Sequence, residues 1–247
     1  IANAAYAISA QISAAVNQFS SNFYTAVRPA LIKSYASNEF GYMNKLFMLS
    51  NKVIFMLMLI LILPIYLSTE PLIRLWLGTV GQYMVEFTRL SLVYTFILCL
   101  SNPITTIVQA ANRVKCYHGI VDTFTLLSLP VVYLLFKRGV SPTYAYMTTI
   151  IVFGIAHIIR LIVLRRTIVF SVKNYFQKFI IPSGFALVLS SIFVCPLSHI
   201  KWNNIFCEII ANTIIAVIVA VLICSLCVLN NEERRMIFGL LKNKIQK

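Results

Sequence analysis

Apolar segments long enough to cross a membrane recur along the whole chain. Of its 247 residues, 60% are hydrophobic and 11% are charged, and the mean hydropathy is +0.85. A helix of about 20 apolar residues spans the hydrocarbon core of a bilayer, where every backbone polar group must be hydrogen-bonded within the protein. The sequence therefore predicts an all-α integral membrane protein.

We expect seven membrane-spanning segments joined by short polar or basic connectors. The second is the most uniformly apolar and should face lipid; it could also start earlier, near Leu46, with the Lys52 side chain extending to the membrane surface. The third should bend at Pro103. Segment 33–52 is expected to be a connector that runs partly along the membrane surface, and 167–178 an interfacial helix, because it mixes basic and aromatic residues. The predicted spans are residues 1–32, 53–67, 84–111, 119–136, 143–164, 179–197 and 205–229.

The net charge of +14 comes from basic residues that gather in alternate connectors. Lys and Arg concentrate in the cytoplasmic loops of membrane proteins, which explains this charge without a nucleic-acid partner. We therefore expect the carboxyl-terminal tail, 230–247, to be cytoplasmic and residue 1 to lie on the outer side. Of the 21 Lys and Arg, all then lie on the cytoplasmic side except Arg74, Arg89, Lys137, Arg138 and Lys201.

The sequence contains no arrangement of residues that indicates catalysis. We find no Gly-rich phosphate loop, paired carboxylates, nucleophile–base pair or cluster of metal ligands. Cys224 and Cys227 have CxxC spacing, but they lie in an apolar run without a second pair, so we interpret them as packing residues. We expect neither an enzyme nor a metal or cofactor, although a proton or sodium gradient could drive transport.

The segment 1–32 differs from the other predicted spans because polar residues recur along one side of it. Gln11, Gln18 and Thr25 are spaced by seven residues. Ser21 lies three residues after Gln18, and Arg28 lies three residues after Thr25. On a helix these positions form one stripe, which must face other helices or a water-filled cavity because lipid cannot satisfy it. We predict that this stripe lines a transport pathway, with Gln11, Asn17, Gln18, Asn22, Thr25 and Arg28 as candidate residues.

This interpretation has simpler alternatives. Arg28 precedes Pro29 near the predicted cytoplasmic end of the segment, where a long basic side chain can extend to the lipid headgroups. The amides and hydroxyls of the stripe could instead bond between helices, where each bond contributes about 0.6 kcal/mol on average. Both interpretations stay open for the group.

Asp122 is the only acidic residue well inside a predicted span. It is therefore a candidate for coupling transport to a proton or sodium gradient. It also falls in the first turn of span 119–136, near His118, where the helix dipole stabilises a carboxylate. The structural role is the preferred interpretation.

Four further polar residues are expected to have structural roles. His157 and Arg160 share one helix face near the predicted cytoplasmic end of their span. Asn102 and Gln109 lie in the third span around Pro103 and should satisfy backbone groups that the bend frees, rather than bind substrate.

Four stretches together carry a family resemblance. They are AVRPALIKSYAS (26–37), LIRLWLG (72–78), IVQAANRVKCYHGIVDTFTLLSLPVVYLLFKRGVSP (107–142) and RLIVLRRTIVFSVKNYFQK (160–178). In these stretches the chain resembles the C-terminal half of a bacterial oligosaccharide flippase of the Wzx type. That family belongs to the multidrug/oligosaccharidyl-lipid/polysaccharide superfamily, which also contains the multidrug and toxin extrusion (MATE) transporters.

The resemblance implies two six-helix lobes around a central cavity. Residues 1–166 would form most of the C-terminal lobe of such a MATE-like transporter. Residues 167–229 would add the interfacial helix and two further spans, and 230–247 would be the basic tail. Because the chain begins at Ile1 without a cleavage signal, we expect it to be part of a longer protein whose N-terminal lobe is missing.

The resemblance also implies a function. Such a flippase moves undecaprenyl-diphosphate-linked oligosaccharide repeat units to the outer leaflet of the bacterial cytoplasmic (inner) membrane, for synthesis of lipopolysaccharide O-antigen or capsule. Its lobes alternate in access around a midplane site. The implied partners are the lipid-linked oligosaccharide, the bilayer, the missing N-terminal lobe and the polysaccharide polymerase machinery. Arginine suits the diphosphate because its guanidinium binds phosphate oxygens bidentately.

Two other functions remain as alternatives. A cation-coupled drug antiporter of the same fold would need buried acids, and Asp122 alone makes a poor site. A membrane-embedded polysaccharide polymerase or ligase would need a sizeable outer loop or a convergent set of acid and base groups. The sequence shows neither feature.

Overall fold

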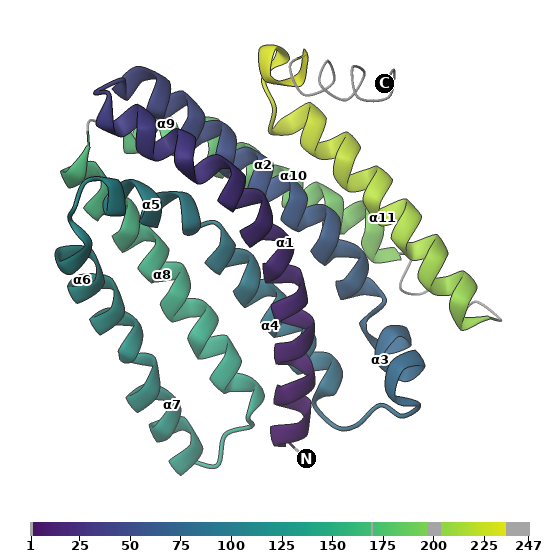
Figure 1. Cartoon of the computed structure of the whole chain (residues 1–247). Coiled ribbons are helices and arrows are strands. Elements are labelled where there is room, and N and C mark those ends of the chain that lie inside the picture. The colour runs from purple at the N-terminus through teal and green to yellow at the C-terminus, as the bar shows by residue number, and fades with distance from the viewer. Residues whose placement is uncertain (1, 169, 197–203, 236–247) are drawn as a thin grey trace.

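The chain folds as a bundle of helices (Figure 1). The computed structural model describes residues 2–168, 170–196 and 204–235, and every secondary structure element named in these ranges is a helix. The elements are α1 (Ala2–Ala36), α2 (Phe40–Leu67), α3 (Thr69–Leu77), α4 (Met84–Cys99), α5 (Asn102–Ala110), α6 (Val114–Leu126), α7 (Ser128–Lys137), α8 (Thr143–Thr167), α9 (Val172–Tyr175), the π-helix η1 (Phe176–Ile180), α10 (Ile181–Val194) and α11 (Ile205–Cys227).

Six helical segments of the described chain are long and apolar enough to cross a membrane, which fits the predicted all-α membrane protein. They are Phe40–Leu67, Met84–Ala110, Val114–Lys137, Thr143–Thr167, Val172–Val194 and Ile205–Cys227. The remaining expected span, 1–32, corresponds to α1, a helix of 35 residues, but it does not reach the apolarity of the other six because of its polar stripe.

Prolines set the breaks within two of these segments. A proline has no N–H, so the carbonyl four residues before it loses its helical partner. α4 ends at Cys99, four residues before Pro103, and α6 ends at Leu126, four residues before Pro130. The bend that Pro103 predicted is therefore confirmed as a break between α4 and α5.

The predicted interfacial helix at 167–178 is instead the start of a spanning segment. α9, η1 and α10 continue one another from Val172 to Val194. Pro182 cannot donate a helical bond, and just before it the backbone N–H of Ile181 bonds the Phe176 carbonyl, five residues back. This wider turn carries the helix past the proline without ending it.

The predicted connector at 33–52 is also mostly helical, because α2 begins at Phe40 rather than at residue 53. Its polar residues find partners, so the helix does not need to end at them. The side chain of Asn51 donates to the Phe47 carbonyl (2.8 Å) and accepts from the Tyr175 hydroxyl (3.2 Å). The expectation that 53–67 faces lipid is wrong, since this stretch of α2 is largely buried.

The helices form two groups on either side of α1, α2 and α4 (Figure 1). α8 packs on α4 and carries α6 and α7 on its outer side, whereas α10 and α11 pack on each other and on α2. Buried aromatic rings join α9 and η1, which lead into α10, to α2. Phe47 contacts Tyr175, Tyr175 contacts Phe179, and Phe179 contacts Phe55. α7 has no buried residue, so it is the most peripheral helix.

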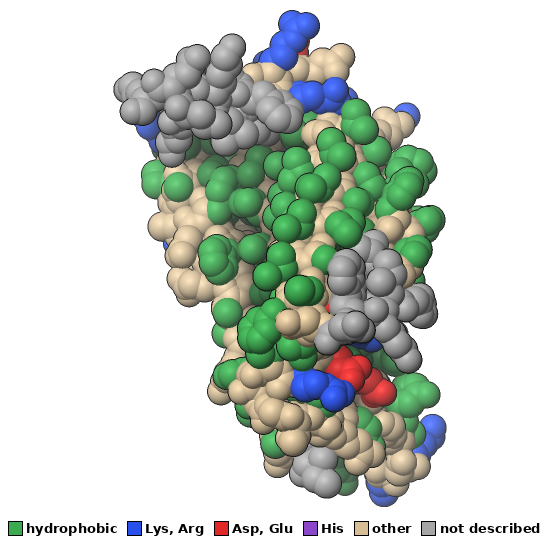
Figure 2. Space-filling view, turned by 90° about the vertical axis from the view of Figure 1, so that its right-hand side faces the viewer, with side chains coloured by type: hydrophobic (Ala, Val, Ile, Leu, Met, Phe, Trp, Pro, Cys, Tyr) green, Lys and Arg blue, Asp and Glu red, His purple; other side chains and the backbone are tan. Residues whose placement is uncertain are grey.

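Basic residues gather at the end of the bundle where α1, α5, α8 and α11 finish and where α2, α6 and α9 begin (Figure 1). We call this the basic end; Lys33, Lys45, Arg113 and Arg165 lie there. On the face that carries α11, hydrophobic side chains cover the middle and Lys and Arg lie toward the two ends (Figure 2). Of the predicted tail, residues 236–247 lie outside the described residues, as does the connector residue Lys201.

Candidate functional site

The polar stripe of α1 is exposed along the side of the helix that faces away from the bundle. Gln11, Gln18, Asn22, Thr25 and Arg28 are all exposed to solvent, although α1 packs against α2, α4 and α5. The opposite side of α1 is apolar or carries small residues, and it is buried at Ala5, Ser9, Val16, Ser20, Tyr24 and Leu31.

Most of the stripe residues bond within α1. The Gln18 amide donates to the Asn22 side-chain oxygen (2.9 Å), and the Thr25 hydroxyl donates to the Ser21 carbonyl (2.8 Å). Asn17 differs, because it is half-buried and accepts a bond from the Cys99 thiol of α4 (3.3 Å). The structure thus keeps Gln18, Asn22 and Thr25 together on the open face and turns Asn17 into the bundle.

Arg28 ties the stripe to a second helix. Its guanidinium Nη2 donates to Oε1 of Gln109 on α5, at 3.0 Å. Gln109 was expected to hydrogen-bond backbone groups that the bend frees. That expectation is wrong for the side-chain oxygen of Gln109, because this oxygen accepts from Arg28. Among the described residues, no carboxylate forms an ion pair with Arg28, so its positive charge is not cancelled locally.

Three polar residues at the start of and along α5 contact three different helices. Ser101, Thr105 and Gln109 are spaced by four residues, which puts them on one side of the helix. Gln109 holds Arg28 of α1, and the hydroxyl of Thr105 lies 3.0 Å from that of Tyr117 on α6. Ser101, just before α5, faces α8. We call these three residues the α5 polar row.

A buried arginine lies where the α5 polar row meets α8. Arg160 is 7% exposed; its Nη1 donates to the Ser101 hydroxyl (3.0 Å), and its guanidinium carbon lies 5.9 Å from the Phe153 ring centre. No described Asp or Glu pairs with it. A buried charge without a counter-charge is costly, so in a spanning helix it indicates a function.

His157 completes this buried group. Its Nδ1 lies 3.2 Å from the Ser101 hydroxyl, which accepts from Arg160 and donates its own hydrogen to the Ile97 carbonyl at 3.4 Å. The other ring nitrogen, Nε2, is buried and has no hydrogen-bond partner among the described residues. The sequence placed His157 and Arg160 on one helix face, but it did not show that Ser101 joins them.

Asp122 lies apart from these groups. α6 begins at Val114 rather than at residue 119, so Asp122 falls beyond the first turn and the predicted dipole stabilisation is wrong. The predicted proximity to His118 is confirmed: its Nδ1 lies 2.9 Å from the Asp122 carboxylate. The Asp122 side chain is exposed on a peripheral helix, and no contact described here joins it to α1 or to the α5 polar row.

Two guanidinium groups therefore flank α5, both held by neutral side chains. Ser101 and Gln109, which hold Arg160 and Arg28, are about 12 Å apart along the helix axis at about 1.5 Å per residue. Neutral ligands keep the geometry of a guanidinium without cancelling its charge, so this arrangement attracts anions and repels cations.

Comparisons with known protein families, with curated proteins and with solved structures found no match for this chain. The family resemblance therefore stays a prediction. The membrane architecture follows from the helices themselves.

Proposed function

We propose that this protein forms the C-terminal half of a flippase that moves undecaprenyl-diphosphate-linked oligosaccharides across the bacterial cytoplasmic membrane by alternating access. The observation that supports this proposal is the exposed polar face of α1, which carries amides, hydroxyls and Arg28 in a chain of membrane-spanning helices. Such a face is unstable against lipid, so it needs water, a polar ligand or another polar surface beside it.

The chemistry of this face suits a sugar diphosphate. Gln11, Gln18 and Asn22 offer both donors and acceptors to sugar hydroxyls, as side-chain amides generally do. Arg28 lies nearer the basic end, where the loading of a diphosphate from the predicted cytoplasmic side would begin. In such a flippase, an N-terminal lobe would supply the opposite wall of the cavity.

The absence of acids from the same face favours an anionic substrate over a cationic drug. α1 contains no Asp or Glu, and Asp122 is exposed on α6 with His118 as its partner. A cation antiporter needs negative charge where its substrate binds, because a cation that has left water must be paired.

The experiment that tests this proposal uses the gene that encodes the chain in its own host. Deletion should remove surface polysaccharide and leave lipid-linked repeat units accessible only from the cytoplasmic face. The intact gene should restore export. Unchanged surface polysaccharide together with increased sensitivity to cationic drugs would overturn the proposal in favour of an antiporter.

Complementation with variants then tests the role of Arg28. Arg28→Ala should reduce export by about tenfold or more without lowering the protein level, since loss of a charge-assisted phosphate contact costs about 1.5–3 kcal/mol. Arg165→Ala removes an exposed arginine from the end of α8 and serves as the matched control. Normal export by Arg28→Ala would remove Arg28 from the substrate site.

A further inference from the structure

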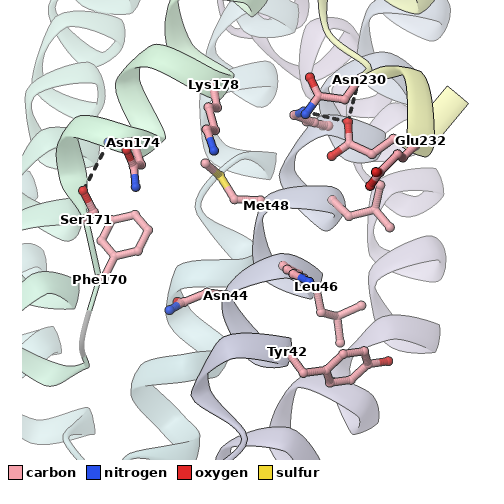
Figure 3. Close-up of a pocket in the computed structure, with 14 residues that line it drawn as sticks. Tyr42, Asn44, Leu46, Met48, Phe170, Ser171, Asn174, Lys178, Asn230 and Glu232 are labelled. Carbon is pink, nitrogen blue, oxygen red and sulfur yellow. Dashed lines mark hydrogen bonds and ion pairs between the residues drawn. The ribbon is translucent and has the colours of Figure 1, made fainter.

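A pocket of about 790 Å³ opens at the basic end of the bundle, and none of its lining residues lies on α1 (Figure 3). The first turns of α2 form its floor. One wall is the segment from residue 170 through η1, and the other is the chain that follows α11. A volume of this size matches that of typical small-ligand sites.

A buried ion pair holds the second wall in place. The Lys52 ammonium lies 2.7 Å from the Glu233 carboxylate, and the Lys52 side chain is only 3% exposed. The same carboxylate oxygen accepts the backbone N–H of Asn230 (2.8 Å). These two bonds fix the turn after α11 against α2, so the pocket does not depend on a ligand for its shape.

The first wall is fixed to α2 as well. Tyr175 is fully buried, stacks on Phe47 and donates its hydroxyl to Asn51. Beside it, the Ser171 hydroxyl accepts the backbone N–H of Asn174 at 3.3 Å and begins the helix. Figure 3 shows Ser171 and Asn174 on one side of the pocket.

The pocket carries a net positive charge. Lys52 and Glu233 cancel each other, which leaves Lys45, Lys178 and Glu232 among its charged lining residues. No described carboxylate forms an ion pair with Lys45 or Lys178. In Figure 3, Lys178 extends between the wall with Asn174 and the wall with Glu232. A single negative charge placed between the lysines would neutralise the site.

The pocket lies at the level of the headgroup layer of a membrane. From Lys45 to Leu67, at the end of α2, the rise is about 33 Å, close to the hydrocarbon thickness of about 30 Å. When Leu67 lies at one boundary of the hydrocarbon, Lys45 therefore lies at the other.

The helix that carries Lys178 also offers an apolar track below it. Ile181, Phe185 and Ile192 follow at helical spacing, and all three are exposed. A molecule with a charged head and apolar chains fits both features at once, with its head in the pocket and its chains along α10.

We propose that this pocket binds the headgroup of a monoanionic glycerophospholipid of the phosphatidylglycerol type. Lys45 and Lys178 contact the phosphodiester, and the side chain of Asn174 contacts the hydroxyls of the terminal glycerol. Basic pockets between transmembrane helices bind anionic headgroups in this way. The proposal does not depend on the flippase function, because the pocket and the polar face of α1 share no residue.

Native mass spectrometry of the purified chain, delipidated and then incubated with each lipid in detergent, tests the proposal. We expect phosphatidylglycerol to be retained and phosphatidylethanolamine, which has no net charge, to be retained at least about tenfold less. Lys45→Gln combined with Lys178→Gln should weaken retention of phosphatidylglycerol about tenfold or more, since each lysine near a lipid phosphate contributes about fivefold.

Two further variants separate this site from general surface attraction. Lys33→Gln with Lys173→Gln removes two exposed lysines from the same end of the bundle, neither of which lines the pocket, and should leave retention unchanged. Glu232→Gln removes the opposing carboxylate and should increase retention. Equal losses in the two double variants, or equal retention of the two lipids by the unaltered chain, would overturn the proposal.

Discussion

At the scale of single residues, Ser101 has the most demanding position in the molecule. Its hydroxyl is the acceptor for the buried guanidinium of Arg160 and lies next to the imidazole of His157. No described Asp or Glu lies beside Arg160 or His157 to take the place of the Ser101 hydroxyl. The cost of removing this one oxygen therefore falls on two buried polar groups together.

Ser101→Ala should lower the free energy of unfolding by about 1–3 kcal/mol, the cost of leaving a buried polar group without its partner. Ser191→Ala is the control, because the exposed Ser191 hydroxyl bonds only the Leu187 carbonyl of its own helix. Denaturation in detergent measures both variants. A Ser101→Ala protein as stable as the Ser191→Ala protein would show that Arg160 finds another acceptor.

At the scale of elements, the end of α11 is joined to the start of α2 by a pair that is unlike the surface pairs. Lys52 is buried and Glu233 is 22% exposed, whereas Arg74 and Glu70 of α3 are 59% and 53% exposed. Exposed pairs contribute little because water screens them, and breaking a buried pair leaves a charge without a partner.

Glu233→Gln should therefore lower the free energy of unfolding by about 1–3 kcal/mol, less than for a fully buried pair because Glu233 is partly solvated. Lys52→Met should cost less, since it removes the buried charge and keeps the apolar stem. Glu70→Gln, which breaks the exposed pair, should change stability by less than about 0.5 kcal/mol. Denaturation in detergent compares the three, and limited proteolysis after α11 should accelerate only in Glu233→Gln and Lys52→Met.

The positions of the helices were largely predictable from the sequence, but their packing was not. The lengths of the apolar segments predicted the spanning helices, and Pro103 predicted the break after Cys99, because both features follow from local chemistry. The burial of α2 was not predictable, since a segment that is apolar on all sides gives no sign of which side meets protein and which meets lipid.

The candidate site was predictable to the same extent. The stripe of Gln11, Gln18, Thr25 and Arg28 follows from helical periodicity, and it lies on one exposed face as a result. The bonds from Arg28 to Gln109 and from Arg160 to Ser101 join residues 81 and 59 positions apart. Contacts at such a separation depend on the tertiary arrangement, which no local pattern contains. The spacing of the α5 polar row, Ser101, Thr105 and Gln109, was the one feature of the sequence that pointed to these contacts.

At the scale of the whole molecule, an exposed polar face on a membrane helix requires a wet surrounding. In the intact protein, Asn22→Cys should react with a membrane-impermeant maleimide, because the proposed cavity brings water to this position. Ile151→Cys, at an exposed apolar position on α8, should not react, because lipid covers it.

Labelling in whole cells and in inverted vesicles, with the six native cysteines replaced, measures this difference. Equal and negligible labelling at both positions would show that the stripe of α1 packs against another helix rather than against water. In that case the interhelical interpretation of the stripe would replace the pathway.

The neutral ligand of Arg28 has a consequence for how an anion would exchange at this position. The guanidinium is held by the uncharged amide oxygen of Gln109, so an incoming anion meets no described carboxylate that it must displace. Arg28 also has further N–H donors besides the one that Gln109 accepts. In the proposed flippase, a diphosphate would therefore be captured and released here without any exchange of ion-pair partners within the protein.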